Sequence, residues 1–326
     1  MRKIFYTLSL GSLGLVLIIF AVTVDSTPIQ SAPSLDTTYI CPDLNEMSKP
    51  TIVMFAGAFH QKEHLKLVLP IIEAKGYPII SQTLSTVNDS ALTLTDDIAQ
   101  MHGIFTPLFA KDKDVVLVIH SYAGMPGSAA IKGLSKAERA SNGLLGGIIG
   151  VIYESAFIPA EGVSLVDIIG GFATWQNPDV RILFLDSGAM VKNSLQKKPK
   201  AIPLTNAQYD TGLLGVAQPI PIFYNDVPDQ LAQWAASIFE SHSLISVTDK
   251  SGPVGYQDTG YAGRLAYIRT EDDKAIPVAG QDAMMQGSGV NFTVEKYETG
   301  HSPFLSHPDM LADTLDKLAQ SFVELE

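Results

Sequence analysis

Apolar positions along the chain follow two patterns, short unbroken apolar runs and longer segments with an apolar residue every third or fourth position. The first pattern is typical of buried strands and the second of helices with one buried face. Predicted strands cover residues 51–55, 77–80, 115–119, 144–153, 265–270 and 292–297. Predicted helices cover residues 61–75, 94–109, 127–132, 228–239, 278–286 and 308–323, the second with Thr95 as its cap. This alternation predicts an α/β fold, a mostly parallel sheet flanked by helices over residues 49–326.

The alternation fails between about residues 157 and 240, where prolines interrupt the pattern. These are Pro159, Pro178, Pro199, Pro203, Pro219 and Pro221. A segment of this kind inside an otherwise regular α/β pattern predicts an inserted cap, about 157–240, which contains the helix at 228–239.

The N-terminal segment has a different composition from the rest. Arg2 and Lys3 precede an uncharged run at residues 4–24. Residues 1–26 are therefore predicted to be a cleaved signal peptide. The alternative is a signal anchor, because the run is long enough to span a bilayer and would attach the protein to a membrane. Residues 27–48, rich in Ser, Thr and Pro, are predicted to be a linker.

Either leader would direct the folded domain into the secretory lumen or outside the cell. Sequons at Asn88 and Asn291 are compatible with a secreted glycoprotein. The chain has 326 residues, 46% of them hydrophobic, and a net charge of −12, which disfavours nucleic acid as a partner. With Cys41 as the single cysteine and seven scattered histidines, no intramolecular disulfide, metal or cofactor is expected.

The predicted strand at 115–119 runs directly into His120-Ser121-Tyr122-Ala123-Gly124, before a predicted helix. A serine on a sharp strand-to-helix turn is typical of a nucleophile elbow, which raises the hydroxyl above the end of the sheet. The simpler interpretation is a serine that only caps the following helix. The later acidic and histidine segments favour the nucleophile, with His120 as a packing residue.

A serine nucleophile needs a base and an orienting acid. His301 lies on a Gly-His turn between the predicted strand at 292–297 and the predicted helix at 308–323. Glu271, Asp272 and Asp273 all follow the strand at 265–270, and the pattern alone does not choose among them. If none of the three served, Asp226 would be the next candidate. The chain order serine, acid, histidine is that of the α/β-hydrolase triad.

An acyl-transfer site also needs two N–H groups that stabilise the developing negative charge. One is expected from the backbone of Tyr122, the residue after the nucleophile. The other is expected from the loop after the first strand, where Gly57 permits a close turn and Ala58 supplies the N–H.

Four segments together resemble the α/β-hydrolase superfamily, in particular the small plant-esterase and hydroxynitrile-lyase-like branch with its microbial relatives. They are residues 55–60, 118–124, 270–277 and 300–304. The resemblance covers nearly all of the chain after the leader. In this branch the acid stands a few residues before an apolar-proline pair such as Ile276-Pro277, which implies Asp273.

The resemblance implies a serine hydrolase that cleaves a small-molecule carboxylic ester or lactone through an acyl-enzyme on Ser121. Ile119 and Ala123 stand where the elbow motif usually has glycines. Gly57 and Ser302 stand where the lyases have a threonine and a lysine, so a lyase is not favoured. Two alternatives remain: a lyase or acyltransferase on the same scaffold, and a binding protein without catalysis.

Overall fold

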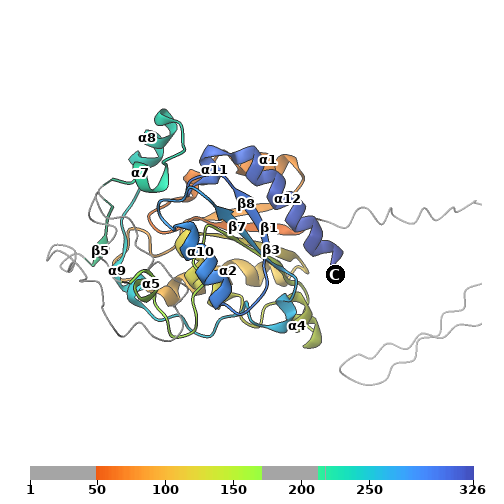
Figure 1. The fold of residues 1–326 in the computed structure, drawn as a ribbon. Helices are drawn as coiled ribbons and strands as arrows, with labels where there is room; N and C mark the ends of the chain where they lie inside the picture. The colour runs from red at the N-terminus through yellow and green to blue at the C-terminus, as the bar shows by residue number, and fades with distance from the viewer. Residues whose placement is uncertain (1–48, 171–211, 217) are drawn as a thin grey trace, which may run out of the picture. The chain divides into compact units, whose positions relative to one another are not determined.

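The computed structural model describes residues 49–170, 212–216 and 218–326, which Figure 1 draws in colour. The predicted signal or anchor at 1–26, the predicted linker at 27–48 and the middle of the predicted cap lie outside the described residues. Within the part that is described, no helix is both long and apolar enough to cross a bilayer.

The core is a six-stranded sheet in which all neighbouring strands are parallel. Its order is β2-β1-β3-β4-β7-β8. The strands are β2 (Ile79–Gln82), β1 (Thr51–Phe55), β3 (Asp114–His120), β4 (Gly147–Glu154), β7 (Leu265–Thr270) and β8 (Thr293–Tyr297). Every residue of β1 and β4 is buried, whereas β8 is an edge strand with mostly exposed residues. The sheet confirms the predicted α/β class.

Helices cover both faces of the sheet (Figure 1). On one face α1 (Leu69–Ala74) packs against α12 (Pro308–Glu324), and α12 also contacts β4. The contact with β4 is close, because a Cβ added to Gly150 would lie 2.0 Å from the Phe322 ring. On the other face α2 (Leu94–Phe109) packs against α3 (Gly124–Ala130) and β3, while α10 (Val278–Gly287) packs on β7.

A second group of elements lies between β4 and β7 in the chain, where the cap was predicted. They are α5 (Leu165–Ile169), β5 (Leu213–Leu214), α7 (Ile220–Phe223), α8 (Asp229–Ser237), β6 (His242–Ser243) and α9 (Leu244–Thr248). The pair β5-β6 forms a separate antiparallel sheet, so this region continues beyond residue 240. The segment that follows α8 contacts the loop after β1, since the Glu240 N–H donates to the Phe59 carbonyl at 2.9 Å.

Several predicted boundaries were wrong for local reasons. The helix expected at 61–75 is divided into a 3-10 turn, Lys62–Leu65, and α1, which begins with Pro70 in its first turn. The cap of α2 is Thr93, whose N–H donates to Asp96 Oδ2 at 2.8 Å, and Thr95 lies inside the helix. The strand expected from Leu144 begins only at Gly147.

Candidate active site

The nucleophile candidate Ser121 lies at the carboxyl end of β3, near the centre of the sheet. Its φ angle is +53°, the left-handed region, which costs a non-glycine residue on the order of 1 kcal/mol or more. The turn therefore needs support from its surroundings. The Phe157 N–H supplies part of this by donating to the Ser121 carbonyl at 3.1 Å. The predicted elbow is thus a tight turn stabilised from the end of β4.

Glycines around the turn allow neighbouring backbone to approach it. A Cβ on Gly124 would lie 2.0 Å from the Phe157 carbonyl oxygen, and one on Gly57 would lie 2.7 Å from Ser121 Cβ. Ile119, which stands in place of the usual glycine, is accommodated from the other side. A Cβ on Gly127 would lie 2.9 Å from the Ile119 side chain, so α3 leaves the room that Ile119 needs. The departure from the motif is compensated within the same strand–helix unit.

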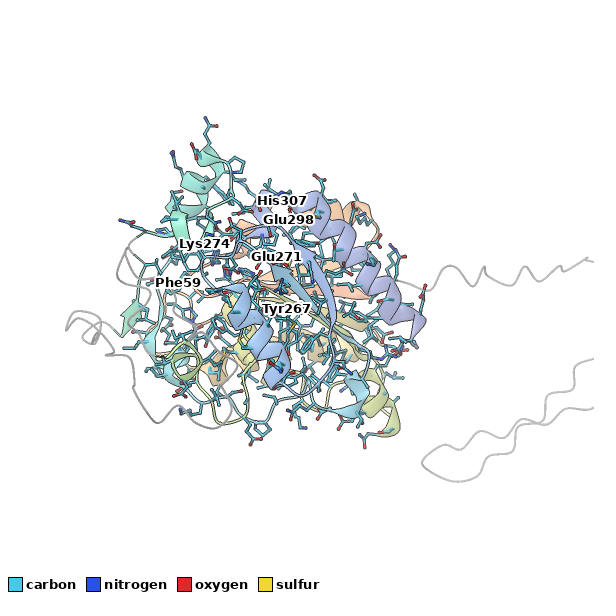
Figure 2. All side chains as sticks on the ribbon, in the orientation of Figure 1. Phe59, Tyr267, Glu271, Lys274, Glu298 and His307 are labelled. Carbon is cyan, nitrogen blue, oxygen red and sulfur yellow. The ribbon has the colours of Figure 1, made fainter. Side chains whose placement is uncertain are left out.

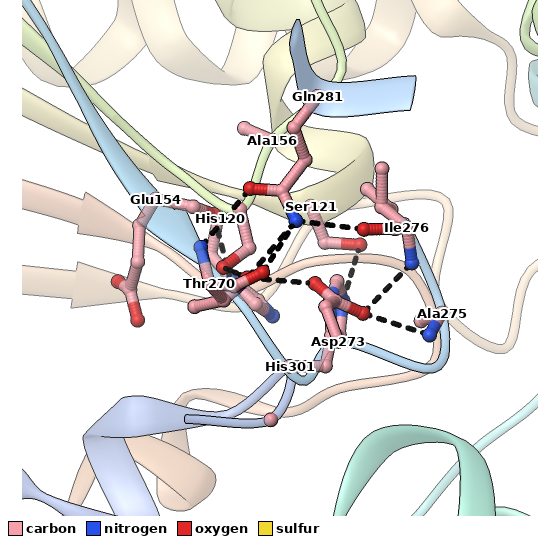
Figure 3. Close-up of polar contacts among 12 residues, drawn as sticks. His120, Ser121, Glu154, Ala156, Thr270, Asp273, Ala275, Ile276, Gln281 and His301 are labelled. Carbon is pink, nitrogen blue, oxygen red and sulfur yellow. Dashed lines mark hydrogen bonds and ion pairs between the residues drawn. The ribbon is translucent and has the colours of Figure 1, made fainter. Parts of the chain in front are cut away.

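Ser121, His301 and Asp273 form one hydrogen-bonded chain (Figure 3). The Ser121 Oγ to His301 Nε2 distance is 2.9 Å, and His301 Nδ1 lies 2.8 Å from Asp273 Oδ2. All three residues are buried, with Ser121 7% exposed. A carboxylate can only accept, so Nδ1 carries the proton and Nε2 presents its lone pair to the serine hydroxyl.

The three acid candidates have different surroundings. Asp273 Oδ1 accepts from two backbone N–H groups, those of Ala275 and Ile276, at 2.7 Å each. Asp272 is exposed and pairs with Lys274, and Glu271 pairs with Arg269. Figure 2 labels Glu271 and Lys274 just past the end of β7. Only Asp273 of the three contacts His301 in the part of the chain that is described.

A buried glutamine on α10 fixes the loop that carries Asp273. Gln281 Oε1 accepts from the Thr270 N–H at 3.1 Å, and Gln281 Nε2 donates to the Ile276 carbonyl at 2.7 Å (Figure 3). The Thr270 hydroxyl in turn donates to Asp273 Oδ2 at 2.9 Å. The acid candidate Asp273 therefore lies in a loop that is hydrogen-bonded at both ends. Sequence reasoning missed Gln281, although a polar residue on the inward face of a helix could have indicated it.

The segment after α7 fastens the histidine loop to the acid loop. Asp226 Oδ2 accepts from the Gly300 N–H at 2.8 Å, and Asn225 Nδ2 donates to the Asp272 carbonyl at 3.1 Å. The approach to Gly300 is close, because a Cβ there would lie 2.4 Å from Asn225 Oδ1 and would displace that side chain. Asp226, the reserve acid candidate, thus contacts the residue before His301 and not the imidazole ring.

The histidines near the site are neutral packing groups. The His120 ring centroid lies 4.6 Å from that of His301, and its Nδ1 lies 3.1 Å from the Glu154 carbonyl. Burial, and then the nearby His301, lower the pKa of His120 well below its usual value. Burial also lowers the pKa of His60, whose Nε2 lies 3.0 Å from the Tyr224 hydroxyl. The sequence predicted a packing role for His120, and the structure identifies the His301 ring as its neighbour.

The loop after β1 contains a backbone N–H, that of Ala58, without a hydrogen-bond partner in the described residues. The His60 N–H donates to the Gly57 carbonyl at 3.3 Å, and all peptide bonds in the described residues are trans. In a trans peptide the N–H points opposite to the carbonyl, so the Ala58 N–H faces away from His60. Ala58 is buried, and its N–H has no hydrogen-bond partner in the described part of the chain. Gly57, the residue before Ala58, packs closely on Ser121, since a Cβ on Gly57 would lie 2.7 Å from Ser121 Cβ.

Comparison with known proteins assigns the family. A model of the alpha/beta hydrolase family matches residues 52–314. The chain belongs to the alpha/beta hydrolase family. It is 24% identical over 282 residues to "Alpha/beta hydrolase nvfD" of Aspergillus novofumigatus, covering 86% of this chain and 100% of that one. It is 24% identical over 291 residues to "Methylesterase 1" of Arabidopsis thaliana, and this match covers 85% of this chain and 99% of that one.

A solved structure of polyneuridine aldehyde esterase has the same fold. Its TM-score is 0.56 at 18% identity, and the match covers 83% of this chain and 100% of that one. These likenesses confirm the resemblance to the plant-esterase branch and support hydrolase activity in the broad sense. In the described residues no group of three or more His, Cys, Asp or Glu side chains is arranged to hold a metal ion.

Proposed function

We propose that this alpha/beta hydrolase cleaves carboxylic esters, including lactones, through an acyl-enzyme on Ser121. The observation that carries the proposal is the chain of contacts from Ser121 Oγ to His301 Nε2, 2.9 Å, and from His301 Nδ1 to Asp273, 2.8 Å. A serine hydroxyl becomes a useful nucleophile only when a base within hydrogen-bond reach takes its proton. The esterase names among the relatives support an ester as the substrate.

In the first half of the reaction Ser121 Oγ attacks the ester carbonyl carbon and its proton passes to His301 Nε2. The carbonyl oxygen becomes an oxyanion, which the Ala58 and Tyr122 N–H groups stabilise. Collapse of this intermediate breaks the bond to the alcohol oxygen, which leaves with the proton from His301. Asp273 orients the ring and stabilises its protonated form throughout.

In the second half water attacks the acyl-enzyme, and His301 accepts the proton that the water loses. The second tetrahedral intermediate releases the carboxylic acid, and Ser121 recovers its proton from His301. This step needs water to reach the carbonyl carbon. An acyltransferase would use the same acyl-enzyme with another alcohol in place of water, so product analysis separates the two functions.

The test uses Ser121→Ala with a panel of p-nitrophenyl esters of graded chain length and a fluorophosphonate probe. We expect the wild type to be labelled and to hydrolyse at least one ester. Ser121→Ala should lose labelling and on the order of 10⁶ in turnover. Ser302→Ala is the matched control, since Ser302 is buried beside His301 but its Oγ has no partner in the described residues.

Activity of Ser121→Ala close to that of the wild type would refute the serine mechanism. Labelling of the wild type without release of free acid would refute hydrolysis and favour acyl transfer. The loss of labelling in Ser302→Ala would mean that the probe reports local unfolding and not the nucleophile.

A further inference from the structure

His242, on the short strand β6, is a buried histidine that the proposed mechanism does not use. Its ring lies edge-on to two aromatic rings, with centroid distances of 4.6 Å to Tyr122 and 5.6 Å to Phe59. Tyr122 follows the nucleophile candidate, and Phe59, labelled in Figure 2, follows Ala58. The imidazole therefore lies beside both loops that supply the proposed oxyanion donors.

The hydrogen bonds around His242 determine its tautomer. Its Nε2 lies 3.1 Å from the Ser246 hydroxyl and 3.5 Å from the Thr86 hydroxyl. Each hydroxyl has a single proton and already donates it, Ser246 to the Ser243 carbonyl and Thr86 to Asp97 Oδ2. Both oxygens thus offer lone pairs to Nε2, so Nε2 carries the ring proton and Nδ1 carries a lone pair.

Backbone pairing holds the main chain of His242 in place from both sides, and the contacts of Nε2 with the two hydroxyls orient the ring. His242 pairs with Leu214 in the small antiparallel sheet and forms a bridge with Val87. On either side of it, the Ser243 N–H donates to the Thr86 carbonyl at 2.9 Å, and the Asn88 N–H donates to the Ser241 carbonyl at 2.8 Å. An acceptor fixed in this way is pre-organised and loses little entropy when a partner binds.

The Nδ1 atom of His242 is buried and has no partner in the described residues. Burial alone lowers the pKa of His242 to about 3, so the ring is neutral, and within the described ranges no charged group shifts this pKa. A buried acceptor without a partner costs on the order of 1 to 3 kcal/mol, which a hydrogen bond from a bound molecule would remove. A neutral lone pair among aromatic rings favours a neutral donor over a cation.

We propose that His242 Nδ1 is a substrate-recognition acceptor, which selects esters that carry a hydroxyl group a few bonds from the scissile carbonyl. This inference rests on the proposed ester hydrolysis and names its substrate class. A site built to bond a hydroxyl discriminates against the analogue that lacks it, because the acceptor is then left unpaired.

The experiment compares pairs of esters that differ by one hydroxyl. Methyl 3-hydroxybutanoate and methyl butanoate place the difference in the acyl part, and 2-hydroxyethyl and ethyl butanoate place it in the alcohol part. Acid release gives kcat/KM for each member of a pair. We expect the wild type to prefer the hydroxylated member of at least one pair by about tenfold.

Replacement of His242 separates the acceptor from the shape of the ring. His242→Phe should abolish the preference, whereas His242→Asn, which can present its Oδ1 near the former Nδ1 position, should retain part of it. The ratio within a pair cancels any general loss of activity in a variant. His102→Phe is the matched control, because His102 is exposed on α2, and it should keep the wild-type ratio.

The inference is overturned if the wild type shows no preference in any pair, or if His242→Phe keeps the wild-type preference. The second result would mean that water satisfies Nδ1 or that another group reads the hydroxyl. If the wild type hydrolyses none of the esters and is not labelled by fluorophosphonate, the proposed function itself fails. That outcome is distinct from hydrolysis without hydroxyl preference.

Discussion

Asp272 and Asp273 are adjacent in the sequence, yet their surroundings are opposite. Asp272 is exposed and lies in a small surface cluster with Lys274 and Asn225. Asp273 is 5% exposed, and donors from Ala275, Ile276, Thr270 and His301 converge on its two oxygens. The chemical identity of the side chain is the same in both, so only the position of the loop distinguishes them.

Asp273→Asn should reduce turnover by about 10³- to 10⁴-fold while the fold is retained. The amide cannot accept the His301 Nδ1 proton with the same strength, and its NH₂ group would favour the wrong tautomer. Turnover with a p-nitrophenyl ester, together with circular dichroism, measures both effects. Asp272→Asn is the control and should change turnover little. A severe loss in the control and a mild one in Asp273→Asn would reverse the assignment.

Glu154, at the end of β4, should make stability depend on pH. It is fully buried, neither carboxyl oxygen has a partner among the described residues, and burial raises its pKa from 4.5 to about 8. Between these values the folded chain keeps a proton that the unfolded chain releases. The free energy of unfolding therefore falls as pH rises from about 4.5 to about 8, by on the order of a few kcal/mol.

Glu154→Gln removes this titration, so its stability relative to the wild type should increase as pH rises from 5 to 8. Urea unfolding at several pH values gives the difference. Glu161→Gln, on an exposed loop, is the control and should show a constant difference. If the Glu154→Gln difference is also constant, Glu154 is ionised or paired in solution.

At the scale of elements, the site depends on how closely the elbow approaches the segment after β4. Gly124 begins α3, and the Phe157 carbonyl occupies the space that its side chain would need. Backbone cannot rotate away as a long side chain can, so any Cβ at this position must shift the elbow or the segment at Phe157. The position of Ser121 is therefore set jointly by α3 and by the chain that follows β4.

Gly124→Ala should lower both the melting temperature and the activity, because the 2.0 Å approach requires a backbone shift. Gly103→Ala is the matched control in α2, where no described atom outside the helix backbone lies within 4 Å of the added methyl group. Replacing glycine by alanine inside a helix stabilises it by about 1 kcal/mol, so Gly103→Ala should raise the melting temperature. If Gly124→Ala and Gly103→Ala changed the melting temperature equally, the predicted clash at Gly124 would be wrong.

At the scale of the whole molecule, the prediction concerns the N-terminal segment and where it directs the domain. We propose that residues 1–26 are a cleaved signal, so the secreted protein should begin between about residues 25 and 32, after the apolar run 4–24. N-terminal sequencing of protein from the medium, after expression in a secretory host, measures this. An intact Met1 in a carbonate-resistant membrane fraction would show an anchor instead. Asn88 and Asn291 are both exposed, and their glycosylation remains a prediction.

The sequence by itself determined the class of the fold and the order of its chemical groups. Buried parallel strands need continuous apolar runs, and helices need their own period, so both leave a local pattern. Parallel strands also end at one edge, which is why polar residues after the strands at 115–119 and 265–270 could be expected to meet. The predicted helix boundaries were wrong where Pro70 begins a new helix and where Thr93, bonded to Asp96, caps α2.

Only the tertiary structure decided which polar groups contact one another. Ser121 and His301 are 180 residues apart, and Gln281, Asp226 and His242 act through loops whose meeting no local pattern records. Whether a buried polar atom is satisfied depends on partners that arrive from distant elements. Such contacts follow from packing and loop closure, and the period of apolar residues carries no information about them. The sequence thus specified the scaffold. The fold brought Asp273, and not its neighbours, to His301, and among the described residues it gave His242 Nδ1 no partner beside the elbow.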